Sequence, residues 1–256
     1  MFEPKNDYEF NLLNIENYNL SPRMIFMKKF IENKAKIRGD YYEFGVFQGS
    51  SIISIALLFK KFGIKKKLYG FDSFEGFPSY SKKDSFDNFK KLYKAKKITE
   101  QHYKSVVNFK KIKEFNQKLN NIKSSLEAKN ISTSNDFSNN SYSFLQDKIK
   151  LLGLKNIVLV KGDFKKTIPS FFKKNKDKKI FAANIDCDLY DSYRIVLSHT
   201  WPRVNINGII LLDEYYSLKF PGARIAADDF FKINKIKPFK TKSWDTDFER
   251  WYIKKK

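Results

Sequence analysis

The sequence YYEFGVFQGSS, residues 41–51, joins an apolar run to a loop that contains two glycines and two serines. Residues 41–46 predict a buried strand that ends in this loop, and residues 50–62 predict a helix that ends at Gly63. Gly45 would let a ligand approach the backbone, and Gly49 and Ser50 would open the helix. We therefore expect the first strand, loop and helix of an α/β fold here, next to a binding site.

The alternation of strand and helix continues on both sides of this stretch. Before it, Ser21 and Pro22 predict the start of a helix over residues 21–36, in a helical N-terminal segment that ends near residue 38. After it, we expect strands at residues 68–72, 157–160, 180–185, 209–212 and 251–253, and helices at residues 167–174, 190–199 and 222–231. This order favours a single α/β domain over residues 1–256, with an open, doubly wound, mostly parallel sheet.

Residues from about 79 to about 150 differ in composition from the rest. Lys, Asn and Ser dominate, and residues 130–142 (NISTSNDFSNNSY) are close to low complexity. Helical spacing of apolar residues is visible near residues 86–93 and 103–115. We interpret the segment as a Lys/Asn-rich helical insertion with a mobile polar loop, which either decorates the surface or forms a lid.

The formal net charge is +22, and nearly all of the basic excess is lysine. Two interpretations remain open: the charge attracts an anionic partner, or it reflects codon bias toward Lys, Asn, Ile and Phe. The single cysteine, Cys187, excludes an intrachain disulfide and indicates a reducing compartment. Neither a secretory signal nor an apolar run long enough to span a bilayer is evident, so we expect a soluble, cytoplasmic protein with no transmembrane segment.

Acidic residues stand at or near the ends of the first five main strands. They are Glu43, Asp72, Asp163, Asp186 and Asp213, and Glu214 follows directly after the last of them. Ligands of open α/β sheets bind outside the carboxyl ends of the strands, so these acids predict a ligand site. Unpaired carboxylates on one rim would repel one another unless a cation lay among them.

Asp186, Asp213 and Glu214 are candidate metal ligands. If they end neighbouring strands, their backbones lie about 5 Å apart, and their side chains could converge on one cation. Oxygen ligands alone select Mg, Ca or Mn over zinc. In the alternative interpretation the acids cap the helices that follow, which suits Asp188 or Asp191 better than the adjacent pair Asp213-Glu214.

Six segments, taken in order, resemble the macrocin O-methyltransferase family, which methylates sugar hydroxyls in macrolide and aminocoumarin antibiotics. The segments are GDYYEFGVFQGSS (39–51), GFDSFEGFP (70–78), GDFKKTIP (162–169), DCDLYDS (186–192), LDEYY (212–216) and PGARIAADDF (221–230). They span most of the chain outside the insertion. The resemblance implies a class I, Rossmann-like methyltransferase fold with a seven-stranded sheet, and S-adenosylmethionine as the methyl donor.

The resemblance also implies roles for individual residues. Asp186, Asp213 and Glu214 would hold Mg²⁺ or Mn²⁺, and Asp188 would act as general base. The residues expected to hold the donor are Glu43, Gly45, Gly49, Ser50, Asp72, Ser73, Asp163 and Asp186.

For three of these residues we expect contact with a particular part of the donor. Asp72 lies at a separation from the glycine loop that would suit an acid accepting both ribose hydroxyls. Asp163 falls where the family contacts adenine, and Glu43 would face the cationic amino-acid end of the donor.

The chain departs from the family pattern at two places. Gln48-Gly49-Ser50 stands where the family usually has Arg-Gly-Gly, and Asp213-Glu214 stands where it usually has Asp-Asp. We expect a homodimer that acts on a small-molecule, sugar-containing acceptor and binds no specific nucleic acid. The alternatives are a metal-dependent methyltransferase of a catechol-like molecule and a nucleic-acid-binding protein driven by basic charge, although no recognised nucleic-acid module is visible.

Overall fold

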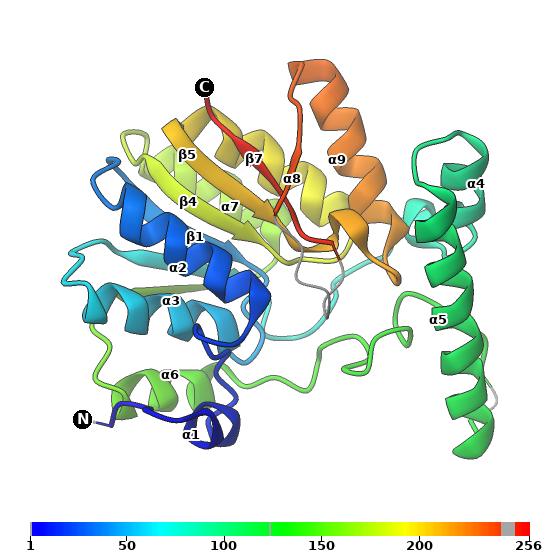
Figure 1. Ribbon diagram of the computed structural model, residues 1–256, viewed down its shortest axis with the longest axis horizontal. Coiled ribbons are helices and arrows are strands. Elements are labelled where there is room, and N and C mark those ends of the chain that lie inside the picture. The colour runs from blue at the N-terminus through cyan, green and yellow to red at the C-terminus, as the bar shows by residue number, and fades with distance from the viewer. Residues whose placement is uncertain (1, 123, 242–248) are drawn as a thin grey trace.

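A seven-stranded sheet with the strand order β3-β2-β1-β4-β5-β7-β6 runs through the protein (Figure 1). The computed structural model describes residues 2–122, 124–241 and 249–256. The strands are β1 (Asp40–Phe44), β2 (Leu68–Asp72), β3 (Ile157–Lys161), β4 (Ile180–Ile185), β5 (Val204–Leu212), β6 (Phe239–Lys240) and β7 (Trp251–Lys254). The predicted strands are all present, and β6 is an additional one that its two residues could not reveal as a pattern.

The sheet is parallel from β3 to β5, and only β7 runs antiparallel, between β5 and β6. The prediction of an open, mostly parallel, doubly wound sheet is therefore confirmed. Because the order reverses between β1 and β4, their carboxyl ends flank the point where such folds bind ligands. β1 ends at Phe44, earlier than the predicted residue 46, because Gly45 has a φ of 88° and leaves the extended conformation.

Helices cover both faces of the sheet (Figure 1). α2 (Pro22–Lys34), α3 (Ser50–Lys61) and α6 (Tyr142–Leu151) pack on one face. α7 (Phe164–Lys174), α8 (Tyr190–Thr200) and α9 (Pro221–Asn234) pack on the other. Side chains alternate along β1, so Tyr41 enters the first core while Tyr42 and Phe44 enter the second. The short elements are α1 (Asp7–Leu12) and the 3₁₀ turns η1 (Lys82–Asp84), η2 (Trp201–Arg203) and η3 (Asp213–Tyr216).

Between β2 and α6 the chain leaves the sheet layers and forms α4 (Asn88–Lys94) and α5 (Glu100–Leu119). Figure 1 shows both helices beside the sheet, at the far end from α1 and α6. Phe89, Leu92 and Val106 form a small core of their own there, against which Ile225 of α9 packs. The two helical patterns seen in this part of the sequence therefore correspond to real helices.

α6 lies with the helices that cover the sheet, although the sequence pattern extended the insertion to about residue 150. Leu145 of α6 is buried in the core that α3 and β2 share. A Cβ on Gly49 would lie only 2.3 Å from Cδ1 of Leu145, so Gly49 lets this helix pack closely. The segment outside the sheet layers therefore ends before Tyr142. Although α6 is rich in polar residues, its apolar side chains pack against the sheet layers.

Asp84 and His102 of the insertion contact the sheet layers. Asp84 Oδ1 accepts a hydrogen bond from the backbone N–H of Tyr190, the first residue of α8, at 2.8 Å. The same oxygen lies 1.9 Å from where a Cβ on Gly222 would be, so only glycine fits there. His102 Nε2 lies 2.9 Å from the backbone oxygen of Ser217, and its ring stacks on Tyr216 at 3.9 Å.

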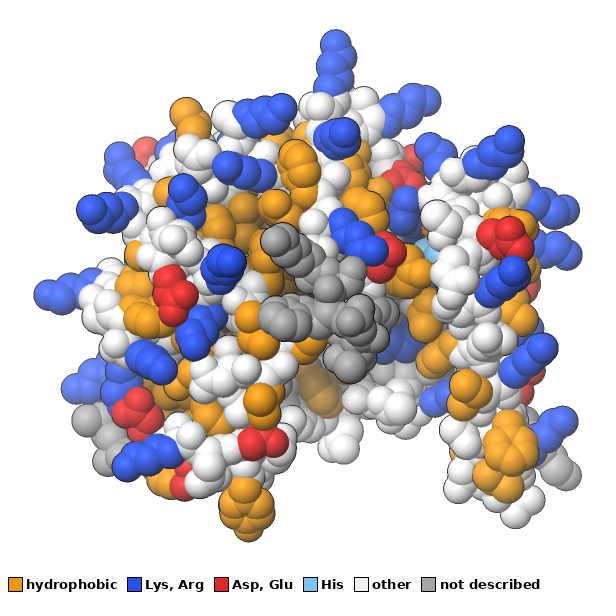
Figure 2. Space-filling model, viewed as in Figure 1, with side chains coloured by type: hydrophobic (Ala, Val, Ile, Leu, Met, Phe, Trp, Pro, Cys, Tyr) orange, Lys and Arg blue, Asp and Glu red, His pale blue; other side chains and the backbone are white. Residues whose placement is uncertain are grey.

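Lysine and arginine side chains are spread over the face shown in Figure 2, on the helices beside the sheet as well as around α4 and α5. They do not gather at one place on this face. Within the described residues, no helix has the length and hydropathy that crossing a membrane would require.

Candidate active site

A cavity of about 250 Å³ opens where β1, β2, β3 and β4 end. The loops that follow these four strands line it, and Arg23 of α2 and Phe137 of the insertion also reach it. Of the residues predicted to hold the donor, those that line the cavity are Gly45, Ser50, Asp72, Ser73, Asp163 and Asp186. Asp188, the predicted base, also lines it.

The loop after β1 has no room for a side chain at Gly45. A Cβ there would lie 1.6 Å from the backbone oxygen of Asp186, and the φ of 88° is in the left-handed region. The loop is held from the next strand, because Asp72 Oδ2 accepts the backbone N–H groups of Val46 and Phe47, both at 2.8 Å. Asp72 therefore shapes the loop as well as facing the cavity.

Asp163 is the N-cap of α7 and accepts the N–H of Lys165 at 2.9 Å. Asp163 also stands on the cavity wall, where it can contact a ligand. The capping role considered for Asp188 or Asp191 is not found, because the N-cap of α8 is Leu189 and has no side-chain capping bond. Ser73 Oγ donates to the backbone oxygen of Gly76 at 2.6 Å, which closes the turn after β2.

Two of the predicted donor residues, Gly49 and Glu43, do not line the cavity, and Glu43 is satisfied by other contacts. It shares a face of β1 with Tyr41, beneath α3, and is fully buried. The Tyr41 hydroxyl donates to Oε2 at 2.9 Å, and the Ser51 hydroxyl donates to Oε1 at 2.7 Å. Burial raises the pKa of Glu43 to about 8 despite these bonds. Ser51 does line the cavity, so Glu43 lies one residue behind the wall.

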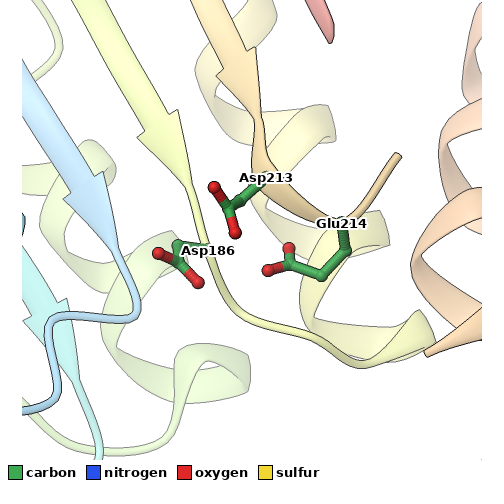
Figure 3. Close-up of side chains that lie close together, drawn as sticks. All are labelled: Asp186, Asp213 and Glu214. Carbon is green, nitrogen blue, oxygen red and sulfur yellow. The ribbon is translucent and has the colours of Figure 1, made fainter. Parts of the chain in front are cut away.

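Asp186, Asp213 and Glu214 lie close together (Figure 3), and of these three Asp186 also lines the cavity. Asp186 follows β4, and the other two open η3 after β5. One oxygen atom from each carboxylate lies within 4.8 Å of the others, as the sequence suggested for a shared cation. Glu214 Oε2 is buried and has no hydrogen-bond partner among the described residues. An unpartnered buried carboxylate oxygen is costly, and a cation would satisfy it.

Two arginines that the sequence did not connect with the strand ends also reach these acids. Arg23 Nη1 lies 2.8 Å from both Asp186 Oδ2 and Asp213 Oδ1, and Arg250 Nη1 lies 2.6 Å from Asp213 Oδ1. The two guanidinium groups therefore already offset part of the repulsion between these carboxylates. The available signal was compositional, because Arg23 and Arg250 are two of the few arginines in a lysine-rich chain, and a guanidinium suits contacts with carboxylates.

The arginines separate the pKa values of the acids. Burial would raise the pKa of Asp213, but Arg250 and Arg23 outweigh it and bring this pKa to about 2. Burial and the neighbouring Asp186 and Asp188 instead raise the pKa of Glu214 well above its ordinary value. The three groups thus differ in proton affinity although they share one small space.

Asp188 has the properties of a basic carboxylate held toward a ligand. Its φ of 59° is unusual for a residue other than glycine and turns the chain back over the cavity. Burial raises its pKa well above the ordinary value, whereas Lys219 acts in the opposite direction. A carboxylate with a raised pKa binds a proton more strongly once it is ionised.

The insertion covers part of the cavity through aromatic contacts. The ring of Phe137 lies 5.3 Å from that of Phe47 and 5.2 Å from that of Phe77. Ile131 is buried with Leu189 and Phe220 in a further small core. The polar stretch 130–142 therefore has two apolar anchors that its composition concealed.

Comparisons with known proteins give a matching family. The family model for macrocin-O-methyltransferase (TylF) matches residues 21–124 and 113–250. No curated protein matches the sequence of this chain.

Solved structures with the same fold include three O-methyltransferases or methyltransferases. NovP, an O-methyltransferase, is 18% identical with a TM-score of 0.62, and the match covers 91% of this chain and 79% of that chain. CalS11, a calicheamicin methyltransferase that a second structure describes as a TDP-rhamnose 3'-O-methyltransferase, is 16% identical with a TM-score of 0.61, covering 99% and 95%. An O-methyltransferase from Bacillus cereus in complex with SAH is 11% identical with a TM-score of 0.53, covering 98% and 92%. Identities this low show a common fold.

Proposed function

The chain belongs to the macrocin-O-methyltransferase family and is an O-methyltransferase; we propose that it methylates a hydroxyl of a sugar-containing acceptor with S-adenosylmethionine and a divalent cation. The single observation that carries this proposal is the convergence of the three carboxylates next to the cavity that the β1–β4 loops form, with Asp186 in the lining of that cavity.

The donor is proposed to lie in this cavity. Four strand ends meet around it, which is where open α/β sheets bind their ligands. Asp72 would direct its carboxylate at the ribose, and Asp163 would face the adenine. Ser50 and Ser51, at the start of α3, would meet the amino-acid end, with Glu43 supporting Ser51 from below. The structurally similar methyltransferase from Bacillus cereus, which is in complex with SAH, supports a donor of this kind.

The cation is proposed to bind Asp186, Asp213 and Glu214. Their oxygens are hard ligands, which suit Mg²⁺ or Mn²⁺, and the unpartnered Glu214 Oε2 supports the assignment of such an ion to these residues. When bound, the donor supplies the methyl group and the cation lowers the pKa of the acceptor hydroxyl.

Asp188 is proposed to take the proton of that hydroxyl. It lines the cavity next to Asp186, and it makes no ion pair of 4 Å or less with any described residue. As the acceptor oxygen attacks the methyl carbon and the carbon–sulfur bond breaks, an ionised Asp188 would hold the released proton. Lys219, which acts against the raised pKa of Asp188, would help to keep it ionised.

The sugar-containing acceptor is the most specific part of the proposal. It is supported by the family match and by the structural similarity to CalS11, a TDP-rhamnose 3'-O-methyltransferase. Phe137, Phe77 and Pro78 form an apolar wall of the cavity, which would exclude water from the reacting atoms.

Calorimetric titration of S-adenosylmethionine and then of Mn²⁺ into the purified protein tests the donor and the metal without knowledge of the acceptor. We expect one site for each. D186N, D213N and E214Q should each lose Mn²⁺ binding, whereas D188N should retain it.

D147N is the matched control, because Asp147 is an exposed acid on α6. Release of SAH in the presence of TDP-rhamnose, and its loss in EDTA, tests the reaction itself. Equal Mn²⁺ binding by wild type and all three triad variants would refute the metal site, and absence of donor binding would refute the cavity assignment.

A further inference from the structure

Arg23 is held from outside the acidic triad by a carboxylate of its own. Its Nη2 lies 2.6 Å from Glu16 Oε2, and its Nε donates to Glu16 Oε1 at 3.3 Å. Glu16 also accepts a hydrogen bond from the hydroxyl of Ser21, which is the N-cap of α2. This paired contact fixes the plane of the guanidinium, because both oxygens of Glu16 are engaged.

The free edge of the guanidinium points at the triad. Nη1 donates to Asp186 and to Asp213 at the same distance, 2.8 Å, so one nitrogen bridges two of the three proposed metal ligands. The Arg23 side chain is only 12% exposed, so water weakens this charge little.

We propose that Arg23 is a positioning residue that acts as a built-in counter-charge of the metal site. This inference rests on the proposed cation at Asp186, Asp213 and Glu214. Without the cation, Arg23 holds two of the ligands together against their mutual repulsion. With the cation present, Arg23 opposes it, because two positive charges then share the same carboxylates. The site is thereby kept assembled, at the expense of affinity for the ion.

This arrangement predicts the direction in which two substitutions change the affinity for Mn²⁺. R23Q removes a positive charge beside the ion and should therefore tighten Mn²⁺ binding, on the order of ten-fold or more, because two like charges a few ångströms apart repel strongly where water is largely excluded. E16Q leaves Arg23 without its own partner, so more of its charge acts on the triad and Mn²⁺ should bind more weakly by a comparable factor. The double variant removes one charge of each sign and should lie close to the wild type.

A purely structural role predicts a different result. If Arg23 and Glu16 only supported the triad, either substitution would disturb the ligands, and both would weaken Mn²⁺ binding. Opposite changes in Mn²⁺ affinity for R23Q and E16Q therefore distinguish a counter-charge from a purely structural role.

Electron paramagnetic resonance of free Mn²⁺ during titration of the metal-free protein measures these affinities without any acceptor. The set comprises wild type, R23Q, E16Q, the double variant and R194Q, whose side chain is 61% exposed on the surface of α8 and should match the wild type. Circular dichroism establishes that each variant is folded, and E16Q decides the question alone if R23Q does not fold.

Tighter binding by R23Q with weaker binding by E16Q supports the inference. A wild type that binds Mn²⁺, together with a folded R23Q that binds it equally or less tightly, or an E16Q that binds it more tightly, refutes the inference and leaves the metal site standing. A wild type that binds no Mn²⁺ refutes the metal site and the inference together.

Discussion

Replacing Glu43 with Gln tests how the first strand supports the cavity. In the native protein Glu43 is fully buried between Tyr41 and Ser51, and its pKa is raised from 4.5 to about 8. Gln has nearly the same shape: its amide NH₂ group can donate to one of the two neighbouring hydroxyls, and its amide oxygen can accept from the other. The substitution therefore removes the ionisation and keeps the packing.

The sign of the expected effect follows from the two pKa values. Below about pH 4.5 Glu43 is protonated in both the folded and the unfolded chain, so it does not favour unfolding there. As the pH rises toward 8, the unfolded chain releases this proton while the folded chain keeps it, so the free energy of unfolding falls. About 3.5 pH units at 1.36 kcal/mol each give a maximum of about 5 kcal/mol.

Urea unfolding of wild type and E43Q between about pH 5 and about pH 8 measures this difference. The other buried acids are common to both proteins, so the change in their stability difference with pH isolates Glu43. We expect E43Q to gain stability relative to wild type by about 3–4 kcal/mol across this interval. A stability difference that stays constant with pH would show that Glu43 is already ionised in the folded protein and would refute the reasoning.

Three further predictions concern the cavity wall. G45A should destabilise the protein by at least about 2 kcal/mol and abolish donor binding, as measured by thermal unfolding and calorimetry, because its Cβ would meet the Asp186 carbonyl; wild-type stability would contradict the contact. D72A should weaken S-adenosylmethionine binding in calorimetry, since it leaves two loop N–H groups without their acceptor at about 1–3 kcal/mol each; unchanged affinity would remove Asp72 from the site. D188N should bind Mn²⁺ as wild type does but lower the methylation rate by about 10²–10⁴-fold; an unchanged rate would exclude Asp188 as base.

The sheet was predictable from the sequence because its strands are buried on both sides. Runs such as residues 180–185 are apolar except for Asn184, and turn or helix signals bound them, so their position and parallel order follow from short-range patterns. The three metal-ligand candidates were predictable for the same reason, since the ends of neighbouring parallel strands must lie together.

The partners of these acids were not predictable in this way. Arg23 stands 163 residues before Asp186, in a helix whose local sequence gives no sign of what its first turn faces. Glu43 was expected in the cavity, but strand alternation turns it beneath α3, where Tyr41 and Ser51 satisfy it. Likewise, nothing local distinguishes Phe137 from its polar neighbours until Phe47 and Phe77 are brought next to it.

The fastenings at Asp84 and His102 limit how the insertion can be exchanged between related enzymes. Asp84 completes the N-terminus of α8, and His102 supports the backbone three residues after Glu214. A chimera that replaced residues 79–141 to obtain a new acceptor preference would lose both supports at once. Grafts that retain Asp84 and His102 and vary only the segment around Phe137 are therefore the ones expected to change selectivity while the core enzyme remains intact.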